Sequence, residues 1–120
     1  MMAISIENKN PLVLAFVGDA VQTLYEREKL CSEDAKVNTL HKQASVTVCA
    51  TAQAKQFDRA SALFTETEHN IANRARNAGH NTVPKSCTLE DYKKATALEA
   101  VIGYNYLSGN KKRVEEILEC

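Results

Sequence analysis

The chain has 120 residues, a formal net charge of zero, 44% hydrophobic residues, no tryptophan, and only 4 glycines and 2 prolines. This length predicts a single domain, residues 1–120, and the scarcity of glycine and proline favours helices over a sandwich or barrel. Zero net charge excludes a global field that draws the chain to nucleic acid or membrane, so a polyanion would have to bind a local patch. The 4 cysteines lack zinc-site spacing, and no signal peptide or membrane-spanning run is found, which predicts a cytoplasmic protein with reduced thiols.

The first predicted helix, residues 11–29, is apolar on more than one face yet carries a glycine and an aspartate at its centre. Asn10 followed by Pro11 is typical of a helix start. The pattern predicts that this helix is buried against several neighbours. Asp19 would then lie where an unpaired carboxylate costs several kcal/mol, and Gly18 removes about 1 kcal/mol of helix propensity. These two costs indicate a functional site, or else a structural aspartate that pairs with a lysine or arginine or caps another helix.

Apolar periodicity and capping residues predict further helices along the rest of the chain. They cover residues 37–55, 57–64, 65–77, 88–107 and 110–119. Glu99 lies in the most apolar part of the helix over 88–107, with Ala95 and Gly103 one turn away on the same face. Small residues flank Asp19 too and let helices approach closely, so we expect these two helices to cross at the two carboxylates. The predicted fold class is an all-α helical bundle.

Two carboxylates that meet in an apolar crossing repel each other unless one takes a proton or a cation binds both. Oxygen ligands without a nearby cysteine or histidine favour Mg²⁺, with Mn²⁺ as a substitute, over zinc. Mg²⁺ usually binds one or two protein carboxylates and fills its other positions with water and substrate phosphates. The pair Asp19 and Glu99 is therefore typical of a site that acts on a phosphodiester.

The local basic patch of this neutral chain lies in the second half of the sequence. Residues 69–89 contain no aspartate or glutamate but include Arg74, Arg76 and Lys85. Arginines near a helix C-terminus complement its dipole, which accounts for one or two of these charges. It does not account for the acid-free loop over residues 79–86, which we expect to contact the phosphates of a nucleic acid.

Four motifs, in order along the chain, resemble the ribonuclease III family. They span Leu14–Val21, Asn38–His41, Arg74–Ala78 with Thr82–Lys85, and Ala97–Leu107. The motifs with Asp19 and Glu99 resemble the signature helix and the second acidic helix of the family. The motifs between them resemble the Mini-ribonuclease III branch, which has the nuclease domain without an appended double-stranded-RNA-binding domain. Ala15 and Thr96 stand where ribonuclease III proper has two further acids, which that branch tends to lack.

The resemblance implies an all-α homodimer that cleaves double-stranded RNA with Mg²⁺ and leaves 5′-phosphate and 3′-hydroxyl ends. It implies that Asp19 and Glu99 are the catalytic, metal-binding carboxylates. The residues that would hold the RNA backbone are Arg74, Arg76, Asn77 and Lys85. The branch implies maturation of 23S ribosomal RNA in a bacterial cytoplasm, with a ribosomal protein as a further partner by analogy. Two other interpretations stay open: a non-catalytic RNA-binding or ribosome-associated helical dimer of the same ancestry, and a plain dimerisation module whose acids form salt bridges.

Overall fold

The computed structural model describes residues 5–31, 35–79 and 85–120. These residues form α-helices and two short 3₁₀ helices, with no strand among them, so the predicted all-α fold is confirmed. The elements in chain order are η1 (Ile6–Asn8), α1 (Pro11–Leu30), α2 (Val37–Val48), α3 (Ala50–Ala60), η2 (Ser61–Leu63), α4 (Glu66–Asn77), α5 (Leu89–Leu107) and α6 (Lys111–Leu118).

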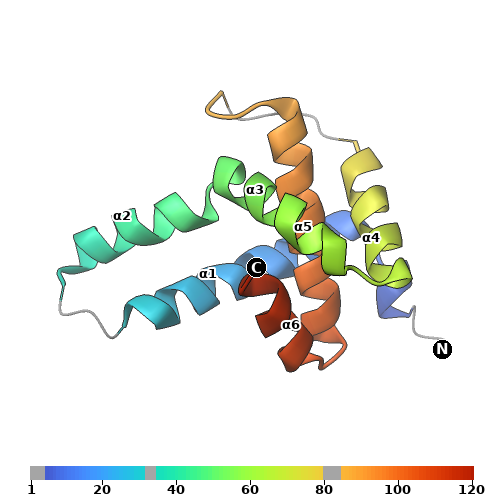
Figure 1. Cartoon of the computed structure of the whole chain (residues 1–120), viewed down its shortest axis with the longest axis horizontal. Helices are drawn as coiled ribbons and strands as arrows, with labels where there is room; N and C mark the ends of the chain where they lie inside the picture. Colours follow the sequence, from blue (N-terminus) through green and yellow to red (C-terminus); the bar gives the residue numbers. More distant parts are fainter. Residues whose placement is uncertain (1–4, 32–34, 80–84) are drawn as a thin grey trace.

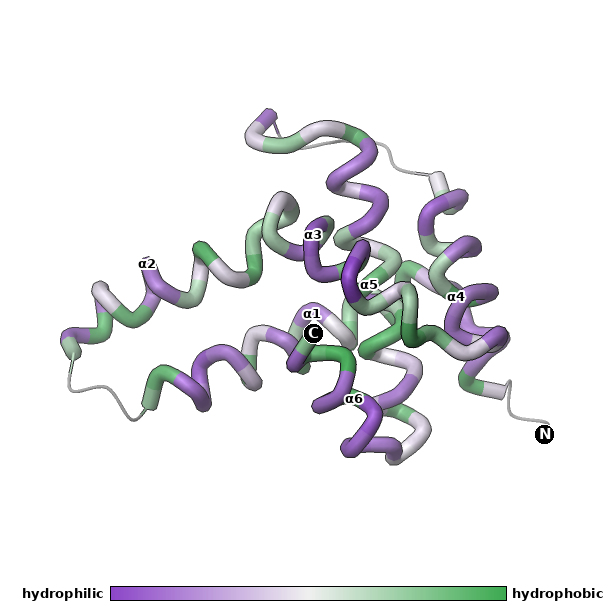
Figure 2. The backbone as a smooth tube through the Cα atoms, viewed as in Figure 1, coloured by the Kyte–Doolittle hydropathy of each residue, from purple (hydrophilic) through white to green (hydrophobic). Residues whose placement is uncertain are grey.

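Helix α5 is the centre of the bundle: α1, α3, α4 and α6 all pack against it (Figure 1). Its middle turns are removed from solvent, and the fully buried residues there include Ala97, Leu98, Val101 and Ile102. Figure 2 shows the hydrophobic residues gathered around this helix. Since burying one valine, leucine or isoleucine contributes about 1.5–3 kcal/mol, the surroundings of α5 hold the bundle together.

Capping side chains fix the starts of three helices where the sequence predicts them. Asn10 accepts a hydrogen bond from a backbone amide of the first turn of α1, and Pro11 follows it. Thr65 and Glu68 form the expected capping box at the start of α4, in which each side chain bonds the backbone amide of the other residue. Thr88 caps α5 through its hydroxyl oxygen, which accepts a hydrogen bond from the backbone amide of Asp91. The predicted starts of α1, α4 and α5 are therefore confirmed.

The prediction of one continuous helix over residues 37–55 is wrong. The chain leaves the helical conformation at Cys49, whose φ of −72° and ψ of 156° are extended, and α3 starts at the next residue. α3 then runs into the segment predicted as a separate helix over 57–64. The three residues before the break, 46–48, are Val-Thr-Val, whose β-branched side chains weaken a helix. The break turns α3 onto α5, whereas α2 stays beside α1 (Figure 1).

α1 and α2 extend together beyond the bundle as a two-helix arm (Figure 1). One face of α1, which we call the outer face, consists of Val13, Phe16, Ala20 and Leu24, and all four residues are exposed. The exposed fractions of Val13, Phe16 and Leu24 are 50%, 79% and 60%. The prediction that α1 is buried against several neighbours on more than one face is therefore wrong for the single chain, because no described element covers the outer face.

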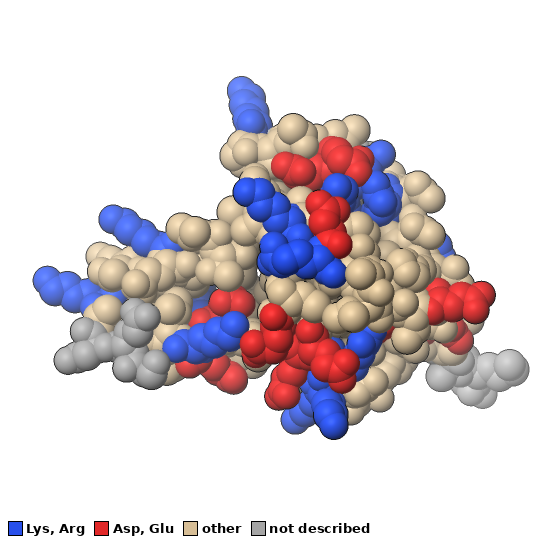
Figure 3. All heavy atoms as spheres, viewed as in Figure 1, with Lys and Arg blue, Asp and Glu red and all other residues tan. Residues whose placement is uncertain are grey.

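Acidic and basic side chains are mixed over the face of the molecule that Figure 3 shows, in small groups of both signs. This mixture agrees with the formal net charge of zero. Of the helices that the structure describes, none combines the length and the apolar character that crossing a lipid bilayer requires.

Candidate active site

Two glycines bring α1 and α5 into backbone contact. A Cβ atom on Gly18 would lie 1.7 Å from the backbone oxygen of Glu99. One on Gly103 would lie 1.9 Å from the backbone oxygen of Leu14. Cβ atoms in proteins do not approach other atoms so closely, so neither position has room for a side chain. The predicted crossing of the two helices is confirmed, and it brings Asp19 beside the helix that carries Glu99.

A hydrogen bond joins the carboxyl groups of Asp19 and Glu99 at this crossing. Burial, this hydrogen bond and the charge of Asp19 raise the pKa of Glu99 to about 8, and a hydrogen bond from Gln53 opposes the rise. The Glu99 carboxyl therefore holds a proton at neutral pH unless a cation takes its place. The two acids meet as the small residues around them indicate, and their roles in catalysis stay a prediction.

Asp19 is exposed in the single chain, so the expectation that it lies in a buried, apolar position is wrong. The reason is that Asp19 borders the uncovered outer face of α1, whereas Glu99 is half-buried between helices. None of the ion pairs among the described residues involves Asp19, so the alternative of a structural aspartate paired with a lysine or arginine has no support. An acid whose neighbour is another acid is typical of a site that shares a proton or binds a cation.

The donor set of this pair fits a hard divalent cation. Two carboxylates with no thiolate or imidazole suit Mg²⁺ or Mn²⁺, which take their other ligands from water and phosphate. Within residues 5–31, 35–79 and 85–120, no group of three or more His, Cys, Asp and Glu side chains gathers. Thr96, where the resemblance places a further acid in ribonuclease III proper, donates its hydroxyl to the backbone oxygen of Tyr92 at 3.0 Å. The protein would therefore contribute few ligands, and most positions would be left to water and substrate.

The two arginines of α4 that are predicted to bind RNA have partners within the protein. Arg74 donates hydrogen bonds to the backbone oxygens of Glu7 and Lys9. Arg76 pairs with the Glu90 carboxylate at 2.6 Å. The first arginine thus ties the N-terminal segment to α4, and the second ties α4 to the start of α5.

The other two predicted RNA-binding residues are exposed and lie at the ends of the predicted basic loop. Asn77 ends α4, and Lys85 precedes α5. Most of the loop predicted over 79–86 falls on residues 80–84, which lie outside the described residues. The structure thus brings the two carboxylates together, while the contact of these four residues with RNA stays a prediction.

Sequence reasoning missed three buried glutamines near the carboxylate pair, namely Gln22, Gln53 and Gln56. Their side-chain amides are hydrogen-bonded to one another, and Gln53 also donates to Glu99. A signal existed, because Gln53 and Gln56 share a helix face with Phe57, which the apolar pattern assigns to the core. Polar residues on a core face require partners, and the position of those partners is set by the tertiary fold.

The fold and the carboxylate pair thus define a helical protein with a candidate site for a divalent cation and a phosphodiester. Comparison with known proteins names the family. The Ribonuclease III domain model matches residues 12–110. The chain is 45% identical to the Mini-ribonuclease 3 of Thermoanaerobacter sp. (strain X514), over 92% of this chain and 78% of the relative. It is 43% identical to that of Brevibacillus brevis, over 92% and 83%.

A solved structure agrees with these relatives. A crystal structure of a protein from Fusobacterium nucleatum matches this fold with a TM-score of 0.89 and 33% identity, over 98% of this chain and 94% of that one. The chain belongs to the ribonuclease III family and is an RNA endonuclease. The resemblance to its Mini-ribonuclease III branch is confirmed, and the family generally depends on a divalent metal.

Proposed function

We propose that this endonuclease hydrolyses double-stranded RNA with Mg²⁺, and that Asp19 and Glu99 are its catalytic, metal-binding carboxylates. The observation that carries the proposal is the hydrogen-bonded carboxylate pair at the backbone contact between α1 and α5. Mn²⁺ would substitute for Mg²⁺ because it accepts the same oxygen ligands. The products would have 5′-phosphate and 3′-hydroxyl ends, as the resemblance implies.

The chain prepares this site by fixing two acids on two helices that cannot separate. The contact at Gly18 sets the spacing between the helices, and the Asp19 and Glu99 carboxyls interact beside this contact. A bound Mg²⁺ would supply Lewis acidity and neutralise the charge that develops on the phosphodiester. Glu99 must give up its proton to become a ligand, because the cation and the proton compete for the same carboxylate.

The test is cleavage of a long duplex RNA with and without Mg²⁺. We expect Glu99→Gln and Asp19→Asn to lose at least about 1,000-fold in rate, because metal assistance supplies several kcal/mol. Both variants should still bind the duplex. Glu115→Gln, which changes an exposed acid on α6, is the matched control and should cut like wild type. Wild-type cutting by either site variant would refute the site, and a folded wild-type protein that binds duplex without cutting it would favour the non-catalytic RNA-binding interpretation.

The outer face of α1 supports a homodimer as the active form. Its large side chains recur at helical spacing, and water covers them in the single chain. Burying each of them against a second copy would contribute about 1.5–3 kcal/mol before the costs of association. Exposed apolar surface that forms one continuous stripe is typical of an interaction site.

Sedimentation tests the dimer. At micromolar concentration we expect the wild type to be a dimer and Phe16→Asp to be a monomer, because the variant buries a charge in the interface. Leu63→Asp is the matched control, since Leu63 is 56% exposed and lies outside the outer face. A wild-type monomer would contradict the dimer, and a dimeric Phe16→Asp variant would move the interface elsewhere.

The RNA backbone would be held by the four residues Arg74, Arg76, Asn77 and Lys85. The Arg76–Glu90 pair lies at the surface, with Arg76 half-buried and Glu90 exposed, at side-chain exposures of 33% and 57%. Exposed pairs contribute only about 0–1 kcal/mol, so Arg76 can exchange Glu90 for a phosphate at little cost. The resemblance further implies a 23S ribosomal RNA precursor as substrate, in a bacterial cytoplasm and with a ribosomal protein as partner.

A further inference from the structure

A chain of hydrogen bonds between buried amides crosses the bundle beside the carboxylate pair. Gln53 of α3 donates through Nε2 to Oε1 of Gln22 on α1 at 2.8 Å. Gln22 donates in turn through Nε2 to Oε1 of Gln56 on α3 at 2.8 Å. Gln56 donates through Nε2 to the backbone oxygen of Leu118, the last residue of α6, at 3.1 Å. The three glutamines are 4%, 0% and 7% exposed in this order, so water does not compete for these bonds.

This series of hydrogen bonds has a fixed direction because it ends on a backbone carbonyl. The Leu118 oxygen can only accept, so Gln56 must turn its amide nitrogen toward α6 and its oxygen toward Gln22. The same requirement then passes to Gln22, which must present its oxygen to the nitrogen of Gln53. Each amide is therefore held in one of its two orientations by the next one along the chain.

The other end of this series of hydrogen bonds, at Gln53, reaches the carboxylate pair. The Gln53 side-chain nitrogen carries two hydrogens, and Gln22 uses one of them. The Gln53 side chain also lies against the Glu99 carboxyl and lowers the pKa of Glu99, which is the effect of a hydrogen-bond donor that favours the ionised form. A reversed chain would present the Gln53 oxygen and leave an ionised Glu99 without this donor.

We propose that Gln53 is a positioning residue that orients the Glu99 carboxylate toward the bound cation, and that Gln22, Gln56 and the Leu118 carbonyl hold Gln53 in that orientation. The inference rests on the proposed function, because it assigns Glu99 as a metal ligand. Groups that hydrogen-bond a metal ligand typically change metal affinity or activity by about 10–100-fold when they are removed. The alternative is a polar layer that only packs the core, in which case Gln53 and Gln56 would be equivalent.

The experiment compares glutamine-to-methionine variants, which keep the volume and remove the amide. Gln53→Met removes the donor to Glu99. Gln56→Met breaks the same series of hydrogen bonds at its far end, so the Gln53 donor stays present but its orientation is no longer fixed from α6. Gln43→Met, at an exposed position on α2, is the control. The first readout is the dissociation constant for Mn²⁺ without RNA, from water-proton relaxation, at a temperature where every variant is folded.

We expect Gln53→Met to weaken Mn²⁺ binding by about tenfold or more, Gln56→Met by about threefold, and Gln43→Met not at all. A Gln53→Met protein that binds Mn²⁺ like wild type would overturn the proposal. So would an equal loss in Gln53→Met and Gln56→Met, because it would show a general loosening of the core. If Gln53→Met does not fold, Gln22→Met replaces it in the Mn²⁺ measurement, because it removes the partner that fixes the orientation of the Gln53 amide. About a threefold weakening is then expected, and unchanged binding overturns the proposal.

The second readout separates this inference from the proposed function. The Mg²⁺ concentration for half-maximal cleavage of duplex RNA should rise in Gln53→Met by the same factor as its Mn²⁺ dissociation constant. A wild type that cuts, with no such rise in the variant, refutes the inference alone. A wild type that binds Mn²⁺ more tightly than Gln53→Met but does not cut refutes the function and supports the role of Gln53 in the metal site.

Discussion

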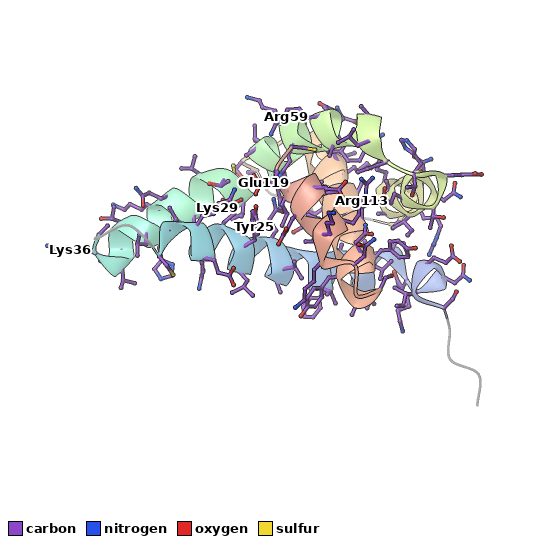
Figure 4. The ribbon with its side chains drawn as sticks, turned by 60° about the horizontal axis from the view of Figure 1, so that its bottom comes forward. Tyr25, Lys29, Lys36, Arg59, Arg113 and Glu119 are labelled. Atoms are coloured by element: carbon purple, nitrogen blue, oxygen red, sulfur yellow. The ribbon has the colours of Figure 1, made fainter. Side chains whose placement is uncertain are left out.

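Two glutamates that pack between helices of the bundle have pKa values shifted in opposite directions. Glu68 is 2% exposed at the start of α4 and bonds Arg113 of α6 at 2.6 Å, the Thr65 amide and the Asn105 side chain. Figure 4 shows Arg113 on α6, from which it also donates to a backbone oxygen next to α4. Burial raises the pKa of Glu68, but these hydrogen bonds outweigh burial and lower the pKa to about 2.

Glu99 has the reverse balance of neighbours. Its pKa rises to about 8 because burial, the hydrogen bond with Asp19 and the charge of Asp19 all favour the protonated form, and only Gln53 opposes them. Burial alone therefore does not identify a functional acid. A buried carboxylate whose charge the protein itself neutralises joins helices together. One that faces a second carboxylate requires a proton or a cation from outside the chain.

The largest effect should come from breaking the Glu68 cluster. We expect Glu68→Gln to lower the free energy of unfolding by about 3–5 kcal/mol, because it leaves the Arg113 guanidinium without its buried partner. Urea unfolding at pH 7 measures this loss. Glu116→Gln removes the other, exposed partner of Arg113 and should cost less than about 1 kcal/mol. Equal losses in the two variants would show that the buried pair contributes no more than a surface pair.

The same contrast explains what the sequence could and could not predict. Local signals sufficed for the caps at Asn10 and Thr65 and for the crossing at Gly18, because capping residues and small residues act on their neighbours in the chain. The pairing of Glu68 with Arg113 could not be predicted, because Arg113 lies 45 residues away and no periodicity connects the two. The exposure of Asp19 also escaped prediction, because an apolar face looks the same in sequence whether its own chain or a second copy covers it.

The second largest effect is a gain in the free energy of unfolding, whereas Glu68→Gln lowers it. Without metal at pH 8, we expect Glu99→Gln to raise the free energy of unfolding by about 1–3 kcal/mol, allowing for the partial exposure of Glu99. The folded wild type holds the Glu99 proton up to a pKa of about 8, while the unfolded chain releases it near the ordinary glutamate pKa of 4.5. Wild-type stability from this group is therefore complete below pH 4.5 and is lost as the pH rises toward 8.

Urea unfolding of wild type and Glu99→Gln at pH 5 and pH 8 measures this effect. The advantage of the variant should be small at pH 5 and largest at pH 8, whereas stability from Glu68 is lost as the pH falls from 4.5 toward 2. A variant that is less stable than wild type at pH 8 would show that Glu99, like Glu68, is neutralised within the protein. The comparison between the two acids would then fail.

The smallest effect is the stabilisation that the cation itself provides. Mg²⁺ at about ten times its dissociation constant stabilises the folded state by about 1.4 kcal/mol, which raises Tm by about 3–6 °C in a chain of this size. Wild type should show this shift at pH 8, and Glu99→Gln should lose most of it, because its amide cannot replace the carboxylate as an ionic ligand. Glu68→Gln starts from a lower Tm but should gain the full shift, since Glu68 has no part in the site.

Thermal unfolding with Mg²⁺, and with an equal ionic strength of NaCl as the control, makes the measurement. An equal Mg²⁺ shift in wild type and Glu99→Gln would place the cation elsewhere on the protein, whereas a shift lost in both variants would mean that the two glutamates act on one site.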